Sequence, residues 1–90
     1  MPLYARVFLA TGPPDEVEAA SKEHREHLRK LHAQHQLRFA GEFKNGDGFL
    51  EIIEAVDLHE ADSIARSSPL VAAGLGSWTL REWVEADFED

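Results

Sequence analysis

The segment Leu37–Val56 (LRFAGEFKNGDGFLEIIEAV) decides the fold of this chain. Its first part, residues 37–44, alternates apolar and polar side chains, which is typical of a half-buried β-strand. The next residues, Asn45-Gly46-Asp47-Gly48, are a hairpin signal because glycine adopts positive φ angles at little cost. The apolar run 49–56 then predicts the returning strand. The segment therefore predicts a β-hairpin in the middle of the chain.

One strand and one helix are predicted on the N-terminal side of this hairpin. The run Tyr4–Thr11 (YARVFLAT) is apolar, β-branched and aromatic, and the turn Gly12-Pro13-Pro14 ends it. We expect a helix to follow, capped by Asp15 and continuing to about Gln36, because neither glycine nor proline interrupts this stretch.

On the C-terminal side of the hairpin, a helix is predicted first and a strand after it. Asp57 is expected to cap a second, shorter helix through Arg66, which ends where Ser68 precedes a proline. A further helical turn fits the next residues, and the run 78–85 (WTLREWVE) predicts the last strand. The order β-α-β-β-α-β is the ferredoxin-like arrangement, an α+β fold with two helices on one face of a four-stranded antiparallel sheet.

Both faces of the predicted sheet are apolar. Opposite sides of the first strand carry Tyr4 and Phe8 against Val7 and Leu9, and opposite sides of the third carry Leu50 and Ile52 against Phe49 and Ile53. The helices cover one face only, and soluble monomers avoid an exposed apolar patch of that size. A chain of 90 residues also buries only about 60–65% of its unfolded surface. We therefore expect a homodimer whose sheets pack face to face.

The composition excludes several classes of protein. The length of 90 residues predicts one domain, 1–90, with an acidic tail at about 85–90. The net charge of −8 would repel phosphate backbones, so we expect no nucleic-acid partner. The sequence shows neither a signal peptide nor an apolar run near 18 residues, so we expect no membrane association. The absence of cysteine fits a cytoplasmic protein.

A histidine lies where the first helix should be apolar. At 100° per residue, His24 shares one face of the helix with Val17, Ala20, Leu28, Leu31 and His35. Burying an imidazole without a hydrogen-bond partner costs roughly 1–3 kcal/mol, so His24 needs either a partner or a chemical role. Histidine is also a common general acid or base near neutral pH, which makes His24 the candidate catalytic residue.

The other histidines of this helix do not complete a metal site. His27 and His32 lie on opposite sides of His24, about 60° and 80° away around the helix, and no third ligand is marked nearby. We therefore expect no metal and no cofactor, with His27 and His32 solvated at the edges of the helix.

Three motifs occur together along the chain. They are His24-x-x-x-Leu28-x-x-Leu31, then Leu37-Arg38-Phe39-Ala40-Gly41, then Ser68-Pro69-Leu70-Val71-Ala72-Ala73-Gly74 before a strand with Trp78 and Trp83. In this order and spacing, over nearly the whole chain, the sequence resembles the YciI-like (YCII-related) family. The resemblance implies a dimeric α/β barrel made of two ferredoxin-like protomers. It also implies a pocket in which a His–Asp pair acts on small organic molecules, dehydrochlorination in aromatic degradation being one example.

The chain departs from the family pattern around this pocket. Ser68 stands where the family has the aspartate, Ser21 stands where an arginine often precedes the histidine, and Glu42 replaces the proline that usually follows the glycine. These departures concern the activity of the pocket more than the fold.

The resemblance implies a catalytic role for His24 and a pocket lined by Ser68, Gly41 and Glu42. A serine hydroxyl can orient the His24 ring, but it cannot supply the charge with which a carboxylate stabilises an imidazolium. The carboxylates that would be tested for that role are Glu42, Glu51 and Glu82.

Three functions remain open from the sequence. The first is a small-molecule-binding protein of uncertain or vestigial activity, with a pocket lined by His24. The second is a cofactor-free lyase or hydrolase in which His24 is the general acid or base. The third is a cofactor-free monooxygenase of the dimeric α/β-barrel group.

Overall fold

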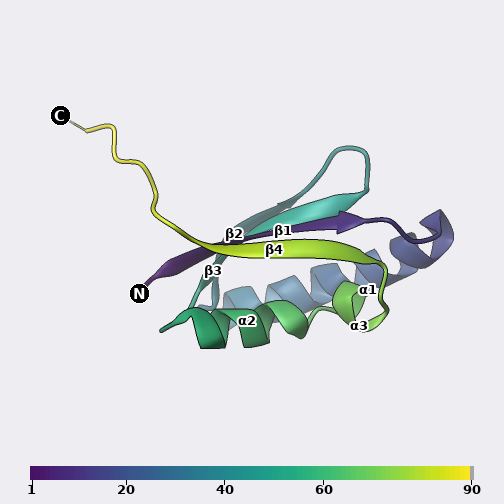
Figure 1. Cartoon of the computed structure of the whole chain (residues 1–90), viewed down its shortest axis with the longest axis horizontal. Helices are drawn as coiled ribbons and strands as arrows, with labels where there is room; N and C mark the ends of the chain where they lie inside the picture. The colour runs from purple at the N-terminus through teal and green to yellow at the C-terminus, as the bar shows by residue number, and fades with distance from the viewer. Residues whose placement is uncertain (90) are drawn as a thin grey trace.

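The computed structural model describes residues 1–89, and its elements follow the predicted order (Figure 1). They are β1 (Leu3–Ala10), α1 (Pro14–Ala33), β2 (Leu37–Glu42), β3 (Gly48–Glu54), α2 (Leu58–Arg66), α3 (Pro69–Ala72) and β4 (Gly76–Trp83). Of the acidic tail predicted at 85–90, residues 85–89 form neither helix nor strand, and Asp90 lies outside the described residues. Within residues 1–89, no helix combines the length and the apolar character needed to cross a membrane.

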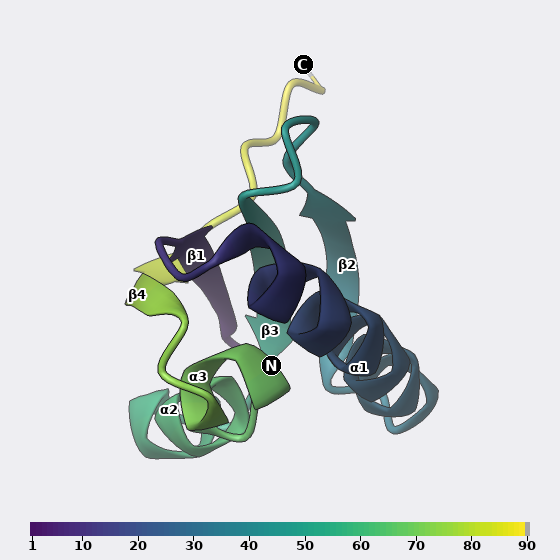
Figure 2. The ribbon, with the colours of Figure 1, turned by 90° about the vertical axis from the view of Figure 1, so that its right-hand side faces the viewer.

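The strands form one antiparallel sheet in the order β2-β3-β1-β4. All the helices lie on one face of it, with α1 to one side and α2 and α3 to the other (Figure 2). The predicted ferredoxin-like arrangement is therefore confirmed, and α3 is the further helical turn after α2. Because β1 and β3 are the inner strands, their helix-facing side chains lie in the middle of the buried layer.

The hairpin between β2 and β3 depends on glycine at two positions. Gly46 has a φ of 74°, which a residue with a side chain adopts only at a cost. Gly48 has a different requirement, because a Cβ atom there would lie 2.0 Å from the carbonyl oxygen of Phe8. Any other residue at position 48 would push β3 away from β1.

The two long helices begin differently. Asp57 accepts a hydrogen bond from the Glu60 backbone N–H and caps α2, as predicted. The predicted cap at Asp15 is wrong, since α1 begins at Pro14 with Pro13 as its N-cap residue and no side-chain cap. Proline suits the first helical position because its missing N–H would have no partner there. Asp15 instead lies within the first turn, where its charge favours the helix dipole.

The first helix also ends earlier than predicted, at Ala33 instead of about Gln36. His35 has a φ of 61°, and the Gln36 backbone N–H donates to the Leu31 carbonyl oxygen at 2.9 Å. This is the left-handed termination that glycine usually provides. The sequence does not signal this helix end, because position 35 is a histidine and not a glycine. Since the helix ends before it, His35 does not lie on the apolar face of the helix and is exposed.

The alternation along the strands separates a helix-facing side from an open side. The side that we call the open face carries Leu3, Ala5, Val7, Leu9, Phe39, Leu50, Ile52 and Trp83. On it, Leu9 and Phe39 are each 48% exposed and Leu50 is 38% exposed. Large apolar side chains therefore lie on both faces of the sheet, although Glu54, Thr79 and Arg81 share the open face. Within residues 1–89 no helix covers the open face (Figure 2).

Candidate functional site

His24 lies in the middle of α1, and its ring is fully buried between the helix and the sheet. The Nε2 atom lies 2.5 Å from Oε2 of Glu51 on β3. The Nδ1 atom lies 2.9 Å from Oγ of Ser68, which precedes α3. The Phe49 and His24 rings pack edge to face, with 4.6 Å between the ring centroids. Both ring nitrogens therefore have a partner within the protein.

Glu51 is held on its other side by a buried arginine. The Arg6 Nη2 atom lies 2.9 Å from Glu51 Oε1, and Arg6 Nε donates to the same oxygen at 3.1 Å. Arg6 Nη1 also donates to the Ala65 carbonyl oxygen at 2.9 Å. Burial lowers the pKa of Arg6, and the neighbouring Glu51 carboxylate opposes that shift. Arg6 and Glu51 are each 1% exposed, so the pair is a true interior salt bridge.

The register of the sheet brings these residues together. Arg6 and Glu51 are directly opposed in the β1–β3 ladder, both on the helix-facing side, and α1 places His24 above them. On the other side of the ring, Ser68 Oγ accepts from the Leu70 N–H at 3.1 Å and so caps α3. We call Arg6, Glu51, His24 and Ser68 the buried network.

The directions of the hydrogen bonds are mutually consistent. A carboxylate can only accept, so the His24 Nε2–H donates to Glu51. Ser68 already accepts from Leu70 and can donate its own proton to His24 Nδ1. No buried side-chain nitrogen or oxygen within residues 1–89 lacks a partner. The buried network is thus fully satisfied without water or ligand.

The carboxylate beside His24 is one of the three that the sequence offered. Glu42 instead lies 3.1 Å from Arg25 on the surface, and Glu82 lies on β4 opposite Tyr4 and is exposed. A signal for Glu51 exists in the strand alternation, because it shares its face with the apolar Phe49. The sequence analysis did not identify Arg6 as part of the site. The strand alternation does place it on the same, helix-facing side of β1 as Phe8.

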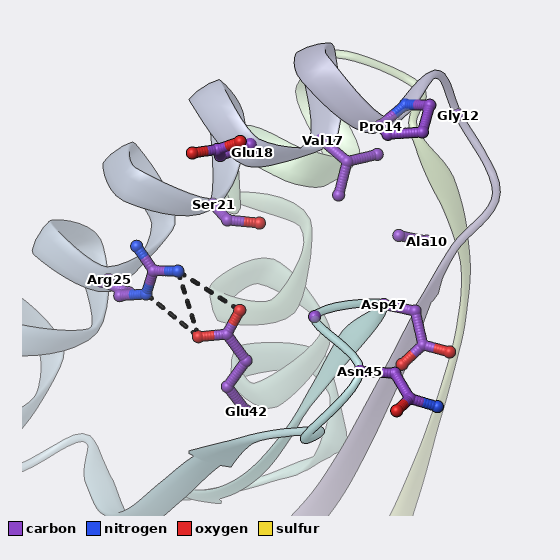
Figure 3. Close-up of a pocket in the computed structure, with 11 residues that line it drawn as sticks. Ala10, Gly12, Pro14, Val17, Glu18, Ser21, Arg25, Glu42, Asn45 and Asp47 are labelled. Atoms are coloured by element: carbon purple, nitrogen blue, oxygen red, sulfur yellow. Dashed lines mark hydrogen bonds and ion pairs between the residues drawn. The ribbon is translucent and has the colours of Figure 1, made fainter.

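Besides a more open hollow of about 540 Å³ against Leu28, His32 and Phe39, the surface has a cavity of about 530 Å³ between the first half of α1 and the β2–β3 hairpin. We call it the main cavity. Its wall is made of Ala10, Gly12, Pro14, Val17, Glu18, Ser21, Arg25, Glu42, Asn45, Gly46 and Asp47. Figure 3 shows the Ser21 hydroxyl directed toward its interior, and the Ser21 residue is 3% exposed.

A second cavity, of about 190 Å³, lies farther along the same seam between α1 and β2. We call it the annex, and it is lined by Arg25, Leu28, Ala40, Gly41, Glu42 and Phe49. Of the predicted pocket residues, Glu42 lines both cavities and Gly41 lines the annex. Neither wall includes His24 or Ser68, and their assignment as site residues stays a prediction. The His24 ring packs against Phe49, which lines the annex.

His27 differs from the solvated edge residue that we expected. It is half-buried, and its Nε2 lies 3.0 Å from Oγ of Ser67. Burial lowers the pKa of His27, and the neighbouring His24 acts in the same direction. His32 is exposed, as expected. Within residues 1–89, no three histidine, aspartate or glutamate side chains gather as metal ligands would.

Several solved structures have a similar fold. One is 5-chloro-2-hydroxyhydroquinone dehydrochlorinase (TftG) from Burkholderia phenoliruptrix AC1100, in complex with 2,5-dihydroxybenzoquinone, at a TM-score of 0.67 and 18% identity over 97% of this chain and 99% of that one. Another is a variant of SnoaB, a cofactor-independent oxygenase from Streptomyces nogalater, at a TM-score of 0.50 and 15% identity over 96% and 93% of the two chains. At these identities the likeness establishes the fold.

The sequence itself is similar to the uncharacterized protein YjpA of Bacillus subtilis (strain 168). The two are 40% identical over 60 residues, which are 67% of this chain and 71% of YjpA. The model of the YCII-related domain matches residues 4–85, from the first residues of β1 to just beyond β4. The chain therefore belongs to the YCII-related domain family.

Proposed function

We propose that the protein is a homodimeric small-molecule-binding protein whose ligand occupies the main cavity, with the buried network acting as its support. The observation that carries this proposal is the burial and complete hydrogen bonding of the His24 ring. Its side chain is fully buried, and both of its ring nitrogens are within hydrogen-bond distance of other side chains. A general acid or base must reach the proton it transfers, directly or through one water. His24 has no free nitrogen for that contact.

Ser68, His24 and Glu51 have the order of a hydroxyl, an imidazole and a carboxylate, as in a catalytic triad. Two observations argue against a nucleophilic role for this arrangement. The Ser68 side chain is fully buried, so a substrate carbonyl has no approach to its Oγ. Its oxygen also accepts from the Leu70 N–H and serves as a helix cap. The geometry is therefore better explained as a satisfied interior network.

The main cavity has the properties of a binding site. Its volume of about 530 Å³ is within the range of roughly 300–1,000 Å³ typical of small-molecule pockets. Val17 and Pro14 supply apolar surface, and the Ser21 hydroxyl supplies a directed polar group. Figure 3 draws hydrogen bonds only between Arg25 and Glu42, so Ser21 makes none to another residue of the wall. A ligand would be the partner of that hydroxyl.

The open face supports the homodimer. Two protomers that stack these faces would bury Leu9, Phe39 and Leu50, which are otherwise among the most exposed large apolar side chains of the sheet. Light scattering at micromolar concentration should give about twice the chain mass of 10.1 kDa. A charge at the centre of the open face, Leu50→Lys, should give a folded monomer, whereas a wild-type monomer would exclude this assembly. The cytoplasmic location remains a prediction from the sequence.

A second function, a cofactor-free lyase or hydrolase with His24 as general acid or base, is favoured by one contact. The Glu51 carboxylate lies beside the His24 ring, where it would stabilise the charged form, the role that the family resemblance gives to the aspartate replaced here by Ser68. This function requires the protein to open and expose Nδ1 or Nε2. No contact within the described residues specifically favours the cofactor-free monooxygenase.

A fragment screen by two-dimensional NMR tests binding in the main cavity. Binders should perturb the backbone signals of Ser21 and the hairpin, and Ser21→Leu should weaken binding because it removes the hydroxyl and places a larger side chain in the cavity. The matched control is Ser63→Leu on the exposed side of α2, which should leave binding unchanged. If no fragment binds the wild-type protein, or if both variants bind equally well, the proposal fails. Turnover of a bound compound that is lost in His24→Asn would favour the second function instead.

A further inference from the structure

The main cavity and the annex meet at a single ion pair. Their walls share Arg25 and Glu42 and no other residue. The pair runs from α1 to β2, with Arg25 Nε and Nη2 donating to the two Glu42 oxygens at 3.1 and 3.2 Å (Figure 3). The side chains of this pair therefore lie between the two cavities.

This ion pair is weak in energetic terms. The Arg25 and Glu42 side chains are 45% and 30% exposed, so water screens both charges. Exposed pairs of this kind add little to the stability of a protein, and both side chains have other rotamers available. The two cavities differ in character, since apart from the shared ion pair the annex is lined only by small or apolar residues, Leu28, Ala40, Gly41 and Phe49.

We propose that the Arg25–Glu42 pair is a gate, and that the ligand is a small organic cation with a short apolar tail. The inference rests on the proposed function and names its ligand class. An ammonium head takes the place of the Arg25 guanidinium on Glu42 and donates a hydrogen bond to the Ser21 hydroxyl oxygen. The tail passes between the separated side chains into the annex, against Leu28 and Phe49.

The charges of the wall select a cation. Apart from Arg25, the charged residues of the main cavity are Glu18, Glu42 and Asp47, all acidic. A cationic ligand restores the partner that Glu42 loses when the gate opens. An anion would instead displace Glu42 from Arg25 and bring a further negative charge into an acidic wall on a chain of net charge −8. The Ser21 hydroxyl, on a residue that is only 3% exposed, is an independent polar group directed into the same space.

Titrations with n-hexylamine, n-propylamine and n-hexanol at pH 7 separate the two parts of the proposal. Burial of the tail predicts an affinity gain of about threefold to fourfold for each added methylene of the amine. Exchange of the ion pair predicts that n-hexylamine binds up to about fivefold more tightly than n-hexanol. The side-chain Nε–H signal of Arg25 should shift on addition of n-hexylamine, because its bond to Glu42 is broken.

Two variants should remove these effects one at a time. Glu42→Gln should abolish the preference for the amine over the alcohol and keep the dependence on chain length. Ala40→Leu should fill the annex, abolish the dependence on chain length and keep the preference for the amine. Glu54→Gln is the control, because its half-exposed ion pair with Arg38 lies outside both cavities.

The outcomes distinguish the gate from the proposed function. Equal affinity for amine and alcohol, an unmoved Arg25 Nε–H signal, or a chain-length effect that survives Ala40→Leu would each overturn the gate. Fragments that bind the main cavity with the Arg25–Glu42 pair intact would overturn the gate and keep the proposed function. Failure of the whole fragment screen would overturn both.

Discussion

Glu51→Gln is the sharpest perturbation of the buried network, because it removes a charge and almost no volume. Glu51 accepts hydrogen bonds from Arg6 and His24, and all three side chains are at most 1% exposed. In the variant, the Arg6 guanidinium stays buried without a counter-charge. Removing one partner of a buried pair typically costs about 3–5 kcal/mol. A domain of this length has a free energy of unfolding of about 5–13 kcal/mol, so the variant should lose a large part of it.

Urea denaturation followed by the fluorescence of Trp78 and Trp83 measures this loss. At fixed protein concentration, and with a slope of about 1.5 kcal/mol/M, the midpoint should fall by about 2–3 M urea. Glu54→Gln makes the same chemical change in a partly exposed pair with 3.9 Å between Arg38 Nη1 and Glu54 Oε1, and should cost less than about 1 kcal/mol. A loss below about 1 kcal/mol for Glu51→Gln, or equal losses in the two variants, would refute the assignment of a buried charge network.

Three further variants probe the buried network and the helix α1. Ser68→Ala removes both the partner of His24 Nδ1 and the α3 cap, and should lower the free energy of unfolding by about 2–4 kcal/mol in the same assay; a loss under 1 kcal/mol would contradict it. The lowered pKa of His27 means that the unfolded state binds more protons below about pH 6.5, so wild-type stability should be complete above that pH and fall as the pH decreases toward 5. His27→Gln should flatten this decline, and identical pH profiles would disprove the contribution. His35→Gly should raise the thermal midpoint, with a gain of about 0.5–1 kcal/mol from relief of the left-handed φ of 61°, and an unchanged midpoint would show that this conformation costs nothing.

The local patterns of the chain were sufficient for most of the fold. The hairpin at 45–48, the cap at Asp57 and the alternation along the strands each act within a few residues, so the sequence displays them directly. The predicted start and end of α1 were both wrong for the same reason. At each end, a residue that is unusual for that position forms the helix terminus. Pro13 ends the loop without a capping side chain, and His35 adopts the conformation that glycine usually takes.

The sequence by itself determined the order of the elements, the open apolar face and the need of His24 for a partner. Each of these follows from helical or strand periodicity, which is a property of neighbouring residues. Only the tertiary structure decided that Glu51 is that partner and that Arg6 holds it, because the β1–β3 register joins residues 45 positions apart. The position of the Arg25–Glu42 pair between two cavities also depends on the tertiary structure. The packing of α1 against β2 brings these two exposed side chains together. Such long-range pairings depend on how whole elements pack, and no local pattern encodes them.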